Sequence, residues 1–164
     1  MKKIDALLNE YGESHQNKTN KLIHWICVPM IFFSIVGLVW SIPQGPLGNI
    51  TLFEHNYINW ATVTLCLVLV YYISLSLLLT LGMTVFSIGC LYCTNLLENM
   101  ITANTINMDL WQISLIIFII AWIFQFVGHK IEGKKPSFFK DIQFLMIGPA
   151  WLMHFIYKKL HIPY

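Results

Sequence analysis

Charge is scarce in this chain. Only 11% of its 164 residues are charged, and arginine is absent, so that all ten basic side chains are lysines. Ordinary soluble domains carry about 25% charged residues. Apolar residues make up 57% of the chain and the mean hydropathy is +0.64, which is more apolar surface than a soluble fold of this size can bury. The composition excludes disordered tails and, with a net charge of only +2, nucleic-acid binders. It indicates a single integral membrane domain over residues 1–164.

Cysteine is also rare and gives no disulfide framework. The four cysteines all lie inside apolar runs, at positions 27, 66, 90 and 93. Cysteines in such surroundings are typical of small core residues. Cys90 and Cys93 have Cys-x-x-Cys spacing, but the chain has no second cysteine pair to complete a zinc site. We therefore expect packing from these residues rather than metal or redox chemistry.

Long apolar runs dominate the rest of the chain. Four of them approach or exceed the roughly 20 residues that cross a bilayer as a helix, and they cover residues 22–40, 58–81, 83–101 and 110–128. Gly82 and its neighbours leave room only for a tight turn between the second and third runs. A fifth run, residues 142–157, is interrupted by Gly148 and Pro149, and proline disrupts helices. The sequence predicts an all-α bundle with four transmembrane helices and a re-entrant or interfacial C-terminal segment.

The placement of lysine predicts the orientation. Lysines precede the first run and follow the fourth, whereas the loops at residues 41–57 and 102–109 contain none. Four crossings bring both lysine groups to one side, and the positive-inside rule assigns that side to the cytoplasm. Lys158 and Lys159 join them if the last segment does not cross. This short chain carries no recognisable organelle address, so we expect a bacterial cytoplasmic membrane with both termini in the cytoplasm.

The polar N-terminal segment contains an amphipathic helix. Apolar and ring side chains recur there at helical spacing, at Ile4, Leu7, Leu8, Tyr11 and His15. Such a stripe predicts a helix that lies on the cytoplasmic surface of the bundle. A turn over residues 17–20 follows, with Asn20 as the expected cap of the first span.

Histidines gather at the predicted cytoplasmic face. His15 ends the surface helix, and His24 lies one turn into the first span. His129 closes the fourth span, and Glu132 follows three residues later, whereas His55 falls in the opposite loop. Imidazole and carboxylate groups are ligands of non-heme iron and also of zinc, and a site of two or three histidines with one carboxylate leaves positions open. We interpret these residues as a candidate metal site on the cytoplasmic side, with His24 and His129 required for catalysis.

Amide side chains accompany the histidines. Asn20 precedes His24 by four residues and Gln125 precedes His129 by four, so each pair shares a helix face. Both amides are suited to orient a ligand ring or a bound water. His154 is a further candidate if the last segment stays on the cytoplasmic side. Taken singly, each of these residues is more often an interfacial anchor, a helix cap or a bond between helices. Their convergence favours a site, because polar groups inside a membrane are costly.

Two motifs resemble those of a known family. The first is Tyr11-x-x-x-His15-x-x-x-x-Asn20-x-x-x-His24-x-x-x-x-Pro29. The second is Gln125-Phe-Val-Gly128-His129-x-x-Glu132-x-x-x-Pro136. Together they resemble the two motifs of the small membrane family typified by the yeast 2-hydroxy fatty acid dioxygenase. The stretch at residues 147–149 is similar to that family's C-terminal apolar segment, so the resemblance covers essentially the whole chain.

The resemblance implies an iron(II)-dependent dioxygenase that uses O2 to shorten a 2-hydroxy long-chain fatty acid by one carbon, as in fatty acid α-oxidation. It implies iron ligands among His15, His24 and His129, with Glu132 as a further candidate. Tyr11, which opens the first motif, is an additional site candidate. Some members carry an acid in the last apolar segment, where this chain has His154. The fourth ligand is therefore open between Glu132 and His154.

Two other functions fit the same residues. A zinc-dependent membrane lipid hydrolase would use the same ligands, because imidazole and carboxylate accept iron and zinc alike. A non-enzymatic lipid-binding or assembly protein would use the polar side chains only to join its helices. The dioxygenase interpretation predicts a 2-hydroxy fatty acid and membrane lipids as partners and no nucleic acid. The pattern predicts neither a chain-length preference nor an oligomeric state.

Overall fold

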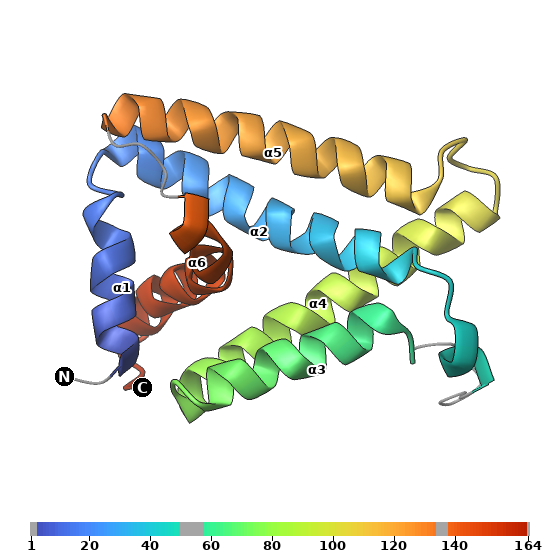
Figure 1. Cartoon of the computed structure of the whole chain (residues 1–164), viewed down its shortest axis with the longest axis horizontal. Coiled ribbons are helices and arrows are strands. Elements are labelled where there is room, and N and C mark those ends of the chain that lie inside the picture. Colours follow the sequence, from blue (N-terminus) through green and yellow to red (C-terminus); the bar gives the residue numbers. More distant parts are fainter. Residues whose placement is uncertain (1–2, 50–57, 134–137, 164) are drawn as a thin grey trace.

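Helices make up the ordered elements of the part of the chain that the structure describes. The structure is a computed structural model and describes residues 3–49, 58–133 and 138–163. In chain order its elements are α1 (Lys3–Glu13), α2 (Lys18–Trp40), the 3-10 helix η1 (Gly45–Asn49), α3 (Trp60–Ile73), α4 (Leu77–Thr102), α5 (Leu110–Glu132) and α6 (Phe138–Lys159) (Figure 1). Those residues form no strand, and the all-α prediction is confirmed. His55, Lys134, Lys135 and Pro136 lie outside the described residues.

Three helices, α2, α4 and α5, are long and apolar enough to cross a membrane. They correspond to the first, third and fourth predicted spans. α3 is apolar too, but its 14 residues fall short of the roughly 20 that a crossing needs. The described residues therefore support three spans, and the shorter apolar helix α3 packs beside α4 at the place of the second predicted span.

The turn between α3 and α4 comes earlier than the sequence predicts. α3 ends at residue 73 and α4 begins at residue 77, where the Ser76 hydroxyl caps the helix by accepting a hydrogen bond from the Leu79 N–H (3.3 Å). Gly82, expected in the turn, lies inside α4 instead. A Cβ atom at Gly82 would come within 2.6 Å of the Tyr157 hydroxyl oxygen of α6. The glycine allows two helices to touch, and the prediction of a turn at Gly82 is wrong.

α2 and α5 run side by side along most of their length (Figure 1). A Cβ atom at Gly37 of α2 would lie far closer than 3.0 Å to the Ser114 Oγ of α5. A Cβ atom at Gly128 of α5 would lie equally close to the Asn20 Oδ1 of α2. Small residues of this kind let membrane helices approach closely. Because the two helices are antiparallel, the start of α2 lies beside the end of α5.

α1 and α6 lie crosswise to α2 and α5 at one end of the molecule, where both chain termini are also found (Figure 1). The buried side of α1 is formed by Ile4, Leu8 and Tyr11, so the amphipathic N-terminal helix is confirmed. These side chains share one hydrophobic cluster with Ile147 and Trp151 of α6. The crosswise position of α6 fits the interfacial alternative predicted for this segment.

The predicted interruption of the C-terminal segment at Gly148 and Pro149 is wrong, because α6 continues through both residues. Contacts on either side of the proline hold the helix in place. The Tyr72 hydroxyl of α3 donates a hydrogen bond to the Met146 carbonyl before the proline. The Tyr157 hydroxyl after it donates to a backbone carbonyl of α4 (2.7 Å). Hydrogen bonds to two neighbouring helices thus hold α6 in place on both sides of the proline, which by itself favours a kink or a break.

Candidate metal centre

The turn between α1 and α2 brings two of the predicted site histidines together. Asn17 is the N-cap of α2, and its side-chain oxygen accepts hydrogen bonds from the backbone N–H groups of Thr19 (2.8 Å) and Asn20 (3.4 Å). The prediction of Asn20 as the cap is therefore wrong. Asn20 lies inside the first turn of α2, four residues before His24. Its backbone carbonyl is therefore within reach of the His24 ring. His15 lies in the turn itself and is only 2% exposed.

His15, His24 and His129 form one group at the lysine-rich end of the molecule. One ring nitrogen from each lies within 4.8 Å of the other two. The ring centroids are 4.2 Å apart for His15 and His24, 5.0 Å for His24 and His129, and 5.4 Å for His15 and His129. Nitrogens that share an ion at about 2.0–2.1 Å are at most about 4 Å apart. Small side-chain rotations would therefore suffice for the three rings to hold one ion.

Hydrogen bonds to the backbone fix the tautomers of two of these rings. The His15 Nδ1–H donates to the Tyr11 carbonyl (2.6 Å), and the His24 Nδ1–H donates to the Asn20 carbonyl (2.9 Å). A carbonyl can only accept, so both Nδ1 atoms carry a proton, and in the neutral rings both Nε2 atoms keep a lone pair. The buried His15 Nε2 has no hydrogen-bond partner within the described part of the chain. A backbone bond on the far nitrogen is typical of metal-binding histidines, so these residues fit a metal ion.

Burial keeps His15 neutral. It lowers the pKa of His15 to about 4, chiefly because the imidazolium would lose its hydration, and this outweighs the upward effect of the hydrogen bond to the Tyr11 carbonyl. The neighbouring His129 and Lys21 also lower the pKa of His15 by charge repulsion. A neutral imidazole with an accessible lone pair is the form that binds a metal.

Two aromatic rings cover His15. The Tyr11 ring stacks on it at 4.2 Å and 11° between the ring planes. The Trp151 ring of α6 lies 5.3 Å from both the His15 and the Tyr11 ring. Sequence reasoning names Tyr11 through the first motif but misses Trp151, because nothing in the local pattern separates this tryptophan from those expected at a membrane boundary.

The other predicted site residues lie around the three histidines. The Glu132 carboxylate accepts hydrogen bonds from the Asn20 side chain and from two backbone N–H groups of the α1–α2 turn. Gln125 is buried on α5, one turn before His129. His154 lies on α6 within the electrostatic influence of Asp5 and Lys158. The group of metal-ligating atoms within 4.8 Å of one another, as far as the chain is described, contains neither Glu132 nor His154.

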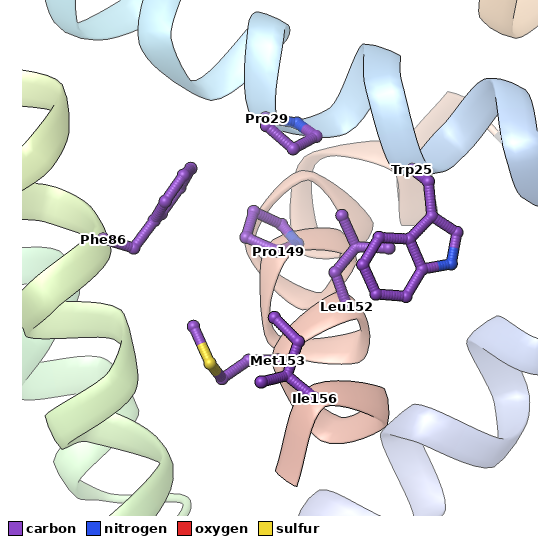
Figure 2. A pocket seen from close by; sticks show the side chains of 7 residues that line it. All are labelled: Trp25, Pro29, Phe86, Pro149, Leu152, Met153 and Ile156. Atoms are coloured by element: carbon purple, nitrogen blue, oxygen red, sulfur yellow. The ribbon is translucent and has the colours of Figure 1, made fainter. Parts of the chain in front are cut away.

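An apolar cavity of about 100 Å³ lies between α2, α4 and α6. Its walls are the seven side chains in Figure 2, namely Trp25, Pro29, Phe86, Pro149, Leu152, Met153 and Ile156. Trp25 directly follows His24, and Leu152 directly follows Trp151, whose ring contacts His15. The cavity therefore has one lining residue on α2 next to His24 in the chain, and one on α6 next to Trp151.

Two comparisons with known proteins find relatives of this chain. A family model described as "2-hydroxy-palmitic acid dioxygenase Mpo1-like" matches residues 1–160. A protein of Saccharomyces cerevisiae (strain ATCC 204508 / S288c), 2-hydroxy-palmitic acid dioxygenase MPO1, is 30% identical over 163 residues, which cover 98% of this chain and 83% of the yeast protein. No solved structure matches the chain.

Proposed function

The chain belongs to the Mpo1-like family, and on this premise we propose that it is an iron(II)-dependent dioxygenase that shortens 2-hydroxy long-chain fatty acids by one carbon. The observation that carries the proposal is the group of three histidines with ring nitrogens within 4.8 Å of one another. Two of its rings present Nε2 lone pairs because their Nδ1 atoms donate to the backbone. The name of the yeast relative supplies the substrate class, a 2-hydroxy fatty acid.

His15, His24 and His129 would hold the ion and leave coordination positions open for small ligands. Iron(II), when bound, supplies the redox chemistry that a reaction with O2 requires. The reaction balances when one 2-hydroxy acid and one O2 give the acid one carbon shorter, carbon dioxide and water. Glu132 and His154 lie outside the histidine group, so we propose these three histidines as the complete set of protein ligands.

The remaining residues would bind and orient the substrate. Lys21 is half-buried and near enough to His15 to affect its pKa, and its ammonium would attract the substrate carboxylate. Tyr11 and Trp151 cover His15 and would keep bulk water from it. The apolar cavity beside Trp25 would receive the first part of the hydrocarbon tail. Lipid is as apolar as the cavity, so the cavity would orient the tail rather than add affinity.

Turnover of 2-hydroxypalmitic acid by iron-loaded protein, with and without O2, tests the proposal. We expect the acid one carbon shorter only when O2 is present. His24→Ala and His129→Ala should each reduce turnover at least 100-fold while the protein still inserts and purifies. His161→Asn serves as the matched control, because His161 is exposed near the C-terminus and its positive φ of 55° suits asparagine.

Two outcomes would contradict the dioxygenase proposal. Equal consumption of the hydroxy acid with and without O2 would show that the reaction does not use O2 as its oxidant. Lipid hydrolysis with zinc and without O2 would instead favour the hydrolase, since the same histidines suit zinc.

A further inference from the structure

The Glu132 carboxylate joins the end of α5 to the turn between α1 and α2. Its Oε1 accepts a hydrogen bond from the Gln16 backbone N–H (2.8 Å). Its Oε2 accepts from the Asn17 backbone N–H (2.9 Å) and from the Asn20 side-chain Nδ2 (3.0 Å). The same Nδ2 donates to the Ser14 carbonyl (3.1 Å). One carboxylate thus holds three donors that belong to a segment more than a hundred residues away in the chain.

Each of these contacts lies next to a histidine of the group. Gln16 directly follows His15. Asn20 accepts the His24 Nδ1–H through its carbonyl (2.9 Å), and Glu132 comes three residues after His129. The carboxylate is therefore a common anchor for the three backbone segments that carry the rings.

The charge of Glu132 matches its place. The N-terminus of a helix favours a negative charge, because its first N–H groups point outward. The first turn of α2 contains no acidic residue, and Lys18 and Lys21 lie there instead. Glu132 supplies from another helix the acid that α2 lacks.

We propose that Glu132 is a positioning residue that sets the spacing of His15, His24 and His129, and that it is not a metal ligand. The inference rests on the proposed metal site. Both carboxylate oxygens are already engaged by donors of the α1–α2 turn. Residues that orient metal ligands in this way typically change metal affinity 10- to 100-fold when replaced.

Binding of cobalt(II), which gives visible bands that report its ligands, tests this role without any turnover. Glu132→Gln keeps the size of the side chain but replaces one acceptor oxygen by an NH2 group, which faces at least one backbone N–H in either orientation of the amide. We expect cobalt affinity about 10- to 100-fold below wild type, with the absorption bands unchanged. Glu132→Asp keeps the charge on a shorter side chain, and we expect its cobalt affinity to lie between those of wild type and Glu132→Gln. It also serves as the milder variant if Glu132→Gln does not insert.

Glu98→Gln is the matched control. The Glu98 Oε2 also accepts a hydrogen bond across helices, from the Trp40 Nε1 (2.8 Å). It lies on α4, near the end of α2 opposite to His24. We expect wild-type cobalt affinity from Glu98→Gln even if its thermal stability falls.

Two results would overturn the positioning role. Changed cobalt bands in Glu132→Gln would make Glu132 a ligand, and wild-type affinity in both Glu132 variants would leave it without a role at the site. A wild-type protein that binds no cobalt, iron or zinc would instead contradict the proposed metal site itself, so the two failures are distinguishable.

Discussion

Replacement of Gly128 by alanine should separate α2 from α5 at the histidine group. A Cβ atom there would lie far closer than 3.0 Å to the Asn20 Oδ1, and 3.4 Å from the Asn20 Cγ. Asn20 is 0% exposed, and its side chain is held by Glu132 and the Ser14 carbonyl. The side chain cannot swing away without breaking those bonds, so the backbones must move apart.

The expected cost follows from this overpacking. Extra atoms in a packed interior typically destabilise by about 1–3 kcal/mol. Because Asn20 and Gly128 lie four residues and one residue before His24 and His129, the movement should also reach the rings. We expect cobalt affinity to fall about tenfold, which corresponds to about 1.4 kcal/mol.

Two further glycine-to-alanine variants separate packing from site geometry in the same assays, thermal unfolding in detergent and cobalt titration. Gly37→Ala makes a similar clash with Ser114 between the same two helices, far from the histidines. It should lower stability and leave cobalt affinity unchanged. Gly89→Ala in α4 meets no atom within 4 Å and should be neutral or stabilising by about 0.5–1 kcal/mol.

The reasoning would be refuted if Gly128→Ala matched wild type in both assays, because the contact with Asn20 would then not be tight. It would also be refuted if Gly37→Ala lowered cobalt affinity as much as Gly128→Ala. The site would then respond to any loosening of the helix pair rather than to the position of Asn20.

Three other predictions follow from the same structure. Burial lowers the pKa of His15 to about 4 from 6.5, so the unfolded chain takes up a proton between these values that the folded chain does not. The free energy of unfolding of the metal-free protein should therefore fall by up to about 3 kcal/mol as the pH drops from 6.5 to 4. In His15→Asn it should fall by less over the same range. Equal pH profiles of stability for the two proteins would contradict this. Met153→Phe fills the apolar cavity and should reduce turnover of long-chain 2-hydroxy acids more than turnover of short-chain ones. Met100→Phe, at an exposed position of α4, should show no such difference. Equal effects of Met153→Phe on both chain lengths would argue against binding of the tail in the cavity. In cells, an impermeant thiol reagent should label Ile42→Cys and not Ile162→Cys, because we expect the termini in the cytoplasm; labelling at residue 162 would reverse that topology.

Much of the histidine group is predictable from sequence because its members lie in two short motifs at helical spacing. Four-residue spacing places Asn20 below His24 and Gln125 below His129 in any α-helix. The lysine pattern also predicts that the two motifs meet at one membrane face. Helical spacing does not predict contacts between residues far apart in the chain. For this reason the sequence suggests Glu132 as a metal ligand, whereas in the structure its carboxylate accepts hydrogen bonds from the α1–α2 turn.

The errors in the fold have a similar origin. Hydropathy does not mark the turn before Ser76, because serine is tolerated inside membrane helices, while Gly82 suggests a turn that the chain does not make. The glycine instead meets the Tyr157 hydroxyl of α6. Pro149 predicts a broken helix, yet hydrogen bonds from Tyr72 and Tyr157 hold α6 on both sides of it. These contacts join residues far apart in the chain, so the local sequence pattern does not predict them.

The metal content of protein purified without oxygen tests the three-histidine site most directly. We expect one iron per wild-type chain, and less than a tenth of that in a variant with His15, His24 and His129 all replaced by alanine. The variant must still insert and purify for the comparison to hold. Wild-type protein with no stoichiometric metal, or a triple variant that retains the full iron content, would contradict the assignment of these histidines as the iron ligands.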